Sequence, residues 1–337
     1  LSFYVAEEIP VIEPLVRELA QLLVVDEFGA PLALPPDRFA EYSDFAQALA
    51  DYEAEPRLRV IFESGAAAGQ VAGAPQGAWE TAFPAWPPAQ TAVMRHYFHG
   101  DGTLRAEPPV AQPSASLYNH DPDEGQRLIL ADGGDIWALL PEWDWPQHAP
   151  GRAIVFESEP LAEDLVILGF SSVDLWIQST ADDADIEVTL SEVRPDGQEM
   201  YVQSGWLRAS MRALAADASE LRPTKTWREA DVAALPSGQW SEARVELSAV
   251  GHAFRAGSRL RLSIDTPGAS RAEWRFALKE MPSDTAISVA HSAAHPSSIA
   301  LPVISDLAVP TPLPPCPSLR SQPCRAHQPY SNTPVPE

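Results

Sequence analysis

The feature that most constrains this chain is a central stretch, residues 151–266, in which apolar and polar side chains alternate. The alternation is clearest over 165–178 and 186–193, where successive side chains would point to opposite faces of a sheet. The turn sequence Arg194-Pro195-Asp196-Gly197 follows and predicts a hairpin partner over 199–210. Because further strand patterns recur at 244–248 and 259–265 without helices between them, we predict an antiparallel β-sandwich or jelly roll and not a doubly wound sheet.

The charge of the chain excludes some partners. The 337 residues carry 47 acidic and 23 basic side chains, a formal net charge of -24. Such a field repels phosphate groups, so we expect neither nucleic acid nor an anionic membrane as a partner. No apolar run approaches the length of a membrane span, and a hydrophobic fraction of 45% argues against wholesale disorder.

The two ends of the chain differ from its centre. Residues 11–25 and 37–54 carry apolar side chains at helical spacing, and we expect these stripes to pack in a core with a neighbouring or absent domain. Residues 58–63 are the one convincing buried strand in the first 150 residues. From Pro302 onward the chain is rich in proline, which predicts an extended tail.

The central stretch resembles the carboxy-terminal domain of the X-Pro dipeptidyl-peptidase and cocaine-esterase-like serine hydrolases, called CocE/NonD. Similar segments occur in the expected order over most of residues 150–280, and the region upstream resembles the segment that joins the hydrolase domain to a jelly roll. The matching segments are Phe156–Leu161, Gly169–Leu175, Ser179–Leu190, Val193–Gly197 and Phe254–Leu262, with Trp79–Pro88, Arg95–Phe98 and Gly102–Leu104 upstream.

This resemblance implies a jelly-roll β-sandwich, similar to galactose-binding domains, attached to an α/β-hydrolase domain that uses a Ser-His-Asp triad and no cofactor. The nucleophile of such enzymes sits in G-x-S-x-G, where small flanking residues permit the strained turn. Here the glycine pairs four apart enclose Ala67, Val71 and Pro75 instead of a serine. The nucleophile motif is therefore absent, and sequence alone identifies no serine partner for any histidine, including His291 and His295 at helical spacing.

We expect the chain to be the carboxy-terminal part of a longer enzyme, with the triad upstream of Leu1. The first residue is not methionine, and the opening pattern is helical. A processed mature chain and a family member without its catalytic half remain alternatives. The expected domains are a remnant of the hydrolase domain at 1–90, the jelly roll at 91–300 and the extended tail at 301–337.

The two cysteines, Cys316 and Cys324, lie in the proline-rich tail. In an exported protein they would close a small disulfide loop, and in a reducing cytosol they would stay free thiols. We favour the disulfide, although the sequence leaves the compartment open.

Two groups of side chains were weighed as ligand sites. Trp137, Trp143 and Trp145 precede the sandwich and would either fill the seam between domains, which we favour, or stack on sugars. The acidic run Asp182-Asp183-Ala184-Asp185 would either cap and turn the chain, which we favour, or bind calcium. No metal site is predicted.

Two functions from different classes follow. In the first, the chain is the non-catalytic part of a serine hydrolase for esters or X-Pro peptides, and its partner is the missing hydrolase domain. In the second, it is a free-standing sandwich whose Trp137, Trp143 and Trp145 bind carbohydrate. The apolar helices at 1–56 favour the first, because a self-contained binding module does not need them. The oligomeric state stays open.

Overall fold

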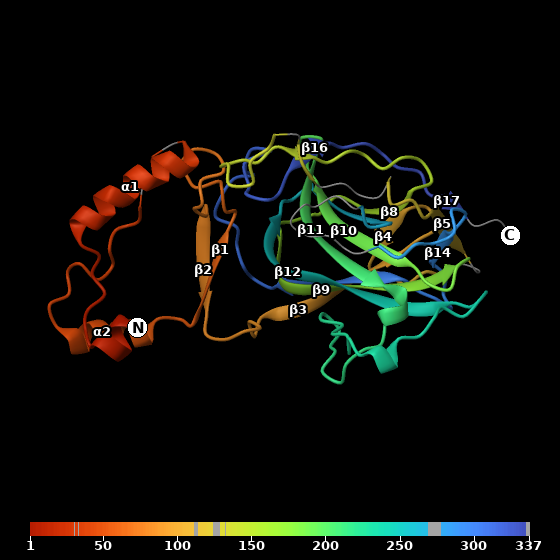
Figure 1. Ribbon diagram of the computed structural model, residues 1–337, viewed down its shortest axis with the longest axis horizontal. Helices are drawn as coiled ribbons and strands as arrows, with labels where there is room; N and C mark the ends of the chain where they lie inside the picture. The colour runs from red at the N-terminus through yellow and green to blue at the C-terminus, as the bar shows by residue number, and fades with distance from the viewer. Residues whose placement is uncertain are drawn as a thin grey trace. The chain divides into compact units, whose positions relative to one another are not determined.

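The protein was analysed as a computed structural model that describes residues 1–29, 31–32, 34–110, 114–123, 129–131, 133–268 and 278–334 (Figure 1). It divides into two compact units, each described here by itself. The N-terminal unit comprises Leu1–Ala89, Asp135–Pro141 and Ser318–Ser321, and the sandwich unit comprises Gln90–Gly134, Glu142–Pro317 and Gln322–Glu337. Among the described helices, none combines the length and the apolar character that a membrane crossing needs.

The N-terminal unit contains helices and one hairpin. Its elements are a π-helical turn at Ser2–Ala6, α1 (Pro14–Phe28), α2 (Phe45–Ala54), β1 (Leu58–Phe62) and β2 (Trp79–Phe83). Its helical part has a small core of Phe3, Phe39 and Ala48, where the rings of Phe3 and Phe39 meet edge to face at 5.2 Å. Few side chains therefore hold this helical part together.

Both helices follow the sequence pattern, with one correction at a helix start. α1 covers most of the predicted segment and ends at Gly29, whose φ of 66° is accessible to glycine at little cost. α2 begins at Phe45, whereas the sequence pattern predicted a start at Asp37. The carboxylate of Asp44 caps α2 by accepting hydrogen bonds from the amides of Ala46 and Gln47. Asp37 instead accepts from the amides of Ile12 and Phe39, so it closes a turn.

The expectation of a single strand in the first 150 residues is wrong. β1 has the predicted position, but it pairs antiparallel with β2, and strands β3 to β7 follow before residue 150. The pairs involved are short or half-exposed, and such strands give little periodic signal. Phe62 of β1 stacks on Trp79 of β2 at 4.2 Å, which ties the hairpin together.

The loop between β1 and β2 approaches another backbone segment within the same unit. Gly65 has a φ of 110°, and a Cβ at this position would collide with the carbonyl oxygen of Ser318. Arg320 donates from Nη1 to the carbonyl of Gly73 at 2.8 Å. Glycine is required at position 65 both for its φ and for the close approach.

The sandwich unit is built from strands and two short 3-10 turns. The strands are β3 (Thr91–Phe98), β4 (Thr103–Arg105), β5 (Ala115–Asn119), β6 (Ile129–Leu130), β7 (Trp143–Asp144), β8 (Ala153–Ser158), β9 (Leu165–Ser179), β10 (Asp185–Val193), β11 (Gln198–Arg208), β12 (Ser241–Phe254), β13 (Arg259–Asp265), β14 (Ala286–Ala290), β15 (Ser298–Ile304), β16 (Cys324–Ala326) and β17 (Thr333–Pro334). The turns are Ala209–Met211 and Glu229–Asp231.

The strands form two runs that make a β-sandwich. One run has the order β16-β11-β10-β13-β8, and β4 joins it to the run β3-β15-β9-β14-β5-β17, in which β12 also pairs with β9. Neighbours pair antiparallel except β4 and β8, which are parallel. Figure 1 shows the β10–β11 hairpin in green. The predicted turn at Arg194–Gly197 connects these strands, with the Gly197 amide donating to the Arg194 carbonyl at 3.0 Å.

The core of the sandwich lies between the two runs. It takes Ile186, Val188 and Leu190 from β10 and Val173 and Leu175 from β9, all almost fully buried. These are the side chains whose two-residue period predicted strands. The mainly β, antiparallel sandwich predicted from the sequence is therefore confirmed.

One glycine sets how closely strands of the two runs approach. A Cβ added to Gly205 in β11 would collide with the carbonyl oxygen of Glu246 in β12. The two backbones meet where a side chain is absent.

The proline-rich residues 301–337 join the sandwich along much of their described length. The first of them complete β15, β16 pairs with β11, and β17 pairs with β5. We name residues 322–334 the carboxy-terminal strap. Its chain is extended, yet it contributes two strands to the sheet order.

Candidate functional site

A buried histidine of the sandwich contacts two serines, which sequence reasoning missed. Ser114 Oγ lies 2.9 Å from His291 Nδ1, and Ser116 Oγ lies 3.1 Å from Nε2. Burial lowers the pKa of His291. Both ring nitrogens are thus engaged by hydroxyl groups, and among the described residues no carboxylate hydrogen-bonds the ring to orient it. The arrangement lacks the third member of a triad, and Ser116 lies within β5 and not at a strand-to-helix turn.

The three tryptophans weighed as a sugar site divide between the units. Trp137 is 66% exposed and belongs to the N-terminal unit, whereas Trp143 and Trp145 belong to the sandwich unit. Trp145 is buried. Its ring centre lies 6.0 Å from that of Tyr201, with the two rings edge to face, and the guanidinium of Arg325 lies 3.9 Å from the ring centre. Trp145 therefore packs inside its own unit.

The acidic run weighed as a calcium site is engaged by protein groups. Asp183 accepts hydrogen bonds from the amides of Ala184 and Ser210, and Asp185 accepts from Arg208 Nε at 2.8 Å and from the Lys279 amide at 2.7 Å. Across the residues that the structure describes, no group of three or more His, Cys, Asp or Glu side chains is arranged to hold a metal ion. These carboxylates hold neighbouring loops through hydrogen bonds and form ion pairs with basic side chains.

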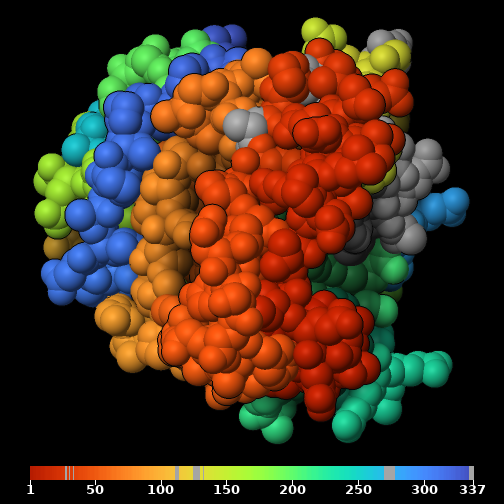
Figure 2. All heavy atoms as spheres, turned by 90° about the vertical axis from the view of Figure 1, so that its left-hand side faces the viewer, coloured from red at the N-terminus to blue at the C-terminus, as the bar shows by residue number. Residues whose placement is uncertain are grey.

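Helix α1 carries apolar side chains that the described residues leave open. Leu15, Leu19 and Leu22 recur on one side of the helix and are 65%, 51% and 67% exposed. In Figure 2 the red and orange atoms of the first residues face the viewer without other segments over them. We name Leu15, Leu19, Leu22 and Leu23 the α1 apolar stripe. The sequence predicted this stripe, and its packing against a neighbouring or absent domain stays a prediction.

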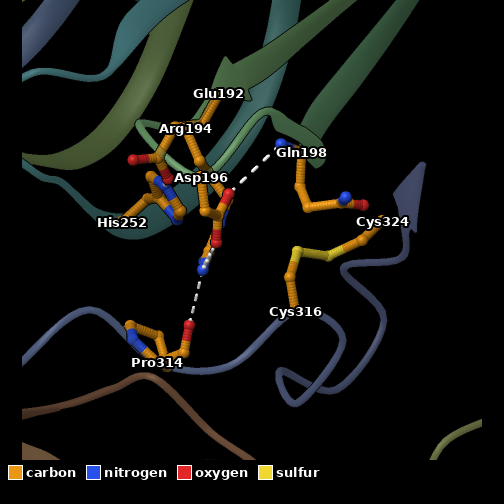
Figure 3. Close-up of a disulfide and its surroundings, with 8 residues drawn as sticks. All are labelled: Glu192, Arg194, Asp196, Gln198, His252, Pro314, Cys316 and Cys324. Atoms are coloured by element: carbon orange, nitrogen blue, oxygen red, sulfur yellow. Dashed lines mark hydrogen bonds and ion pairs between the residues drawn. A yellow bond between two sulfur atoms is a disulfide. The ribbon is translucent and has the colours of Figure 1, made fainter. Parts of the chain in front are cut away.

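The carboxy-terminal cysteines are joined. Cys316 and Cys324 form a disulfide whose Cα atoms lie 5.9 Å apart (Figure 3). The chain just before it is held by the buried Arg194, which donates from Nη2 to the Pro314 carbonyl at 2.8 Å and pairs with Asp196. The disulfide thus connects a segment fixed to the β10–β11 turn with the first residue of β16.

A buried carboxylate lies near the disulfide (Figure 3). Glu192 accepts a hydrogen bond from Ser258 Oγ at 2.6 Å and lies 3.0 Å from His252 Nε2. Burial alone would raise the pKa of Glu192, but the hydrogen bonds of His252, Ser258 and the Arg255 amide hold it below its usual value. The strap reaches this group, because Gln322 Nε2 lies 3.3 Å from His252 Nδ1.

A second buried charge cluster joins the strap to β8, β11 and β13. Arg325 donates from Nε and Nη2 to Glu199 at 2.8 and 2.9 Å, and Arg261 Nε lies 3.3 Å from the same carboxylate. Arg261, only 1% exposed, also pairs with Glu157, which lies 2.9 Å from His327 Nε2. Burial would raise the pKa of Glu199, yet the two arginines keep it low.

His148 is a buried histidine beside this cluster. Burial, together with the positive charges of Arg325 and Arg261, lowers its pKa to about 3. Its Nδ1 lies 3.4 Å from Asp265 Oδ2, which by distance alone would be an ion pair. We regard it as a polar contact of a neutral ring at pH 7, because two guanidinium groups oppose a third positive charge there.

Comparison with known proteins identifies the family of most of this chain. Residues 51–299 match the family described as the X-Pro dipeptidyl-peptidase C-terminal non-catalytic domain. A Mycobacterium bovis protein named as a serine esterase is 29% identical over 235 residues, covering 67% of this chain and 36% of that protein. The cocaine esterase of a Rhodococcus species is 24% identical over 242 residues, covering 65% of this chain and 39% of the esterase. The chain thus spans less than half the length of these relatives.

A solved structure shows the same fold. A CocE/NonD family hydrolase from Staphylococcus aureus superposes with a TM-score of 0.56 at 16% sequence identity, over 90% of this chain and 47% of that chain. Since the family match extends over more than half of its residues, this chain belongs to the X-Pro dipeptidyl-peptidase C-terminal non-catalytic domain family.

Proposed function

We propose that this chain is the non-catalytic part of a CocE/NonD-type serine hydrolase acting on esters or X-Pro peptides. Its sandwich supports a hydrolase domain and helps to shape the substrate entrance. The family match and the length of the relatives support this assignment. In such an enzyme a serine attacks the carbonyl carbon, a histidine takes its proton, an aspartate orients the histidine, and an oxyanion hole holds the developing charge.

The observation that carries the proposal is the α1 apolar stripe. Each of its four leucines is at least half exposed among the described residues. An apolar surface of this kind on a helix favours burial against another protein surface. We propose the hydrolase domain as that surface, which makes the stripe a docking site for the catalytic part of the same enzyme.

The first test is reaction with a fluorophosphonate probe, which labels activated serines. We expect the chain as given to remain unlabelled, because its described Ser–His contacts lack an orienting carboxylate. The full protein expressed from its gene should be labelled at a serine outside residues 1–337. Labelling of Ser114 or Ser116 would contradict the assignment, as would a full protein that the probe does not label.

The second test addresses docking in the full protein. Leu19→Glu/Leu22→Glu would place two charges in the proposed interface, and burying unpaired charges is costly. We expect ester hydrolysis to fall at least about tenfold or the hydrolase domain to melt separately. Gln21→Glu adds a charge to the same helix outside the stripe and serves as the matched control. Equal behaviour of the two variants would argue against docking through α1.

A further inference from the structure

The carboxy-terminal strap binds the sandwich mainly through its backbone and polar side chains. Met200 of β11 pairs with Cys324 of β16, the Tyr201 amide donates to the Pro323 carbonyl, and the His327 amide donates to the Gly197 carbonyl, both at 3.0 Å. Among residues 322–333, all described, only Pro323 is buried. The strap therefore has little apolar surface of its own to hold it in place.

The strap completes the hydrogen bonding of a strand edge. Asn332 Oδ1 accepts from the Val155 amide at 2.8 Å, and Asn332 Nδ2 donates to the Val155 carbonyl at 2.9 Å. The side-chain amide thus takes the place of a neighbouring peptide group beside β8. Such an edge would otherwise present unpaired polar groups.

The strap also supplies partners to buried charges. Arg325 pairs with Glu199, whose side chain is 2% exposed, and the His327 ring and the Gln328 carbonyl both lie 3.1 Å from Arg261 Nη1. Removal of the strap would leave Glu199 with Ser191 and Arg261 as its remaining described partners. Release of the strap would therefore remove partners from buried charges inside the sandwich, and not only from groups at its surface.

The covalent connection of the strap is the disulfide. Cys316 and Cys324 are the two cysteines of residues 1–337, and they are joined to each other. Both residues are half-buried, which leaves the bond within reach of a small thiol. Pro314 on one side is held by Arg194, and Cys324 on the other side is the first residue of β16, which pairs with β11 (Figure 3).

We propose that the Cys316–Cys324 disulfide is a thiol-reducible latch that holds the carboxy-terminal strap on the sandwich. A dithiol reductant supplies two electrons. Its first thiolate attacks one sulfur, the S–S bond breaks, and the departing sulfur is protonated. Its second thiol resolves the mixed disulfide, which leaves two cysteine thiols and an oxidised reductant. The strap then opens from β11 while the core strands stay folded.

The size of the effect follows from the closed loop. In the chain-entropy description, a crosslink of this loop length favours the closed arrangement on the order of 10- to 100-fold. Reduction should therefore raise the open fraction of the strap by that factor. Strands whose stability comes from the apolar core should not respond.

Hydrogen exchange of the whole chain with and without dithiothreitol tests this proposal, with thiol titration to confirm reduction. We expect amides of 322–334 and of Tyr201 to exchange at least about tenfold faster after reduction, whereas β9 and β15 keep their rates. Cys316→Ser/Cys324→Ser should show the faster strap exchange without reductant and no response to it. This variant is the matched control for effects of dithiothreitol elsewhere.

Three results would overturn the proposal. The first is an unchanged strap rate in fully reduced protein, since the strap would then hold without its crosslink. The second is uniform acceleration across β9 and β15, which would make the disulfide a global structural bond. The third is a disulfide that resists millimolar dithiothreitol under native conditions, which would show that the bond is not reachable. The wild-type measurement decides the matter even if the double variant fails to fold.

Discussion

The two units differ in where their apolar side chains lie. The sandwich places Phe98, Phe156, Ile186 and many other apolar residues in one core between its strand runs. Helix α1 of the N-terminal unit instead leaves its leucine stripe at least half exposed. Since burial of apolar area is the main favourable term in folding, the sandwich is stabilised from within, whereas α1 gains little from the described chain. The sandwich thus has a large core of its own, whereas α1 carries the surface that we propose for docking.

The sharpest test of the contrast is a cavity in the sandwich core. Phe156 is fully buried and stacks on Phe98 with ring centres 4.3 Å apart. Phe156→Ala should lower the free energy of unfolding by about 3–5 kcal/mol, because it removes apolar contacts and leaves a cavity. Urea unfolding followed by tryptophan fluorescence measures this. Val93→Ala, at a position 42% exposed, is the control. A loss below about 1 kcal/mol for Phe156→Ala would contradict the single-core description.

The next effect concerns a buried ion pair between strap and sandwich. Arg325→Met should cost about 2–3 kcal/mol, because Glu199 loses its bidentate partner and keeps the hydrogen bond from Ser191 and the longer contact with Arg261. The exposed pair of Arg59 and Glu80 provides the comparison, and Arg59→Met should leave the melting temperature unchanged. Equal melting temperatures for the two variants would show that the cluster does not stabilise the sandwich.

Acid should weaken the sandwich through His148. The unfolded chain binds a proton at the usual imidazole pKa of about 6.5, whereas the folded ring resists protonation until pH falls to about 3. The stabilising contribution is therefore complete above pH 6.5 and decreases as the pH falls, by about 2 kcal/mol at pH 5. Chemical denaturation between pH 7 and 5 should show a shallower decline for His148→Gln. Parallel declines for variant and wild type would refute a buried neutral ring.

The smallest effect is expected in α1. Leu22→Ala removes an exposed side chain, and alanine has high helix propensity, so the free energy of unfolding should change by less than about 0.5 kcal/mol. Circular dichroism and urea titration of the chain as given measure this. A loss of more than about 1 kcal/mol would mean that the helix is already packed in solution, for example against a second copy.

Sequence patterns predicted the sandwich better than its surroundings. The two-residue period of β9 and β10 marked side chains of the common core, although β10 is buried along its whole length. The start of α2 was misplaced, since an aspartate at a turn and an aspartate at a helix cap look alike in sequence. β2 was missed although its burial pattern equals that of β1, because Glu80 and Thr81 interrupt the apolar run that marks β1 in the sequence.

The site was less accessible to sequence reasoning. The pairing of Cys316 with Cys324 could be posed because the chain has two cysteines. The contact between Arg325 and Glu199 could not, because 126 residues separate them and single charges carry no periodic signal. His291 and Ser114 are 177 residues apart and were missed for the same reason.

Gly205 has a consequence for homologous proteins. Where β11 passes the carbonyl of Glu246, a lone hydrogen atom takes the position that a methyl group would otherwise occupy. A relative that carries alanine or serine there must shift one strand outward, and the change would be transmitted along the β10–β11 hairpin to the turn that anchors the strap. We therefore expect homologues without this glycine to differ also at the residues that hold the carboxy-terminal strap.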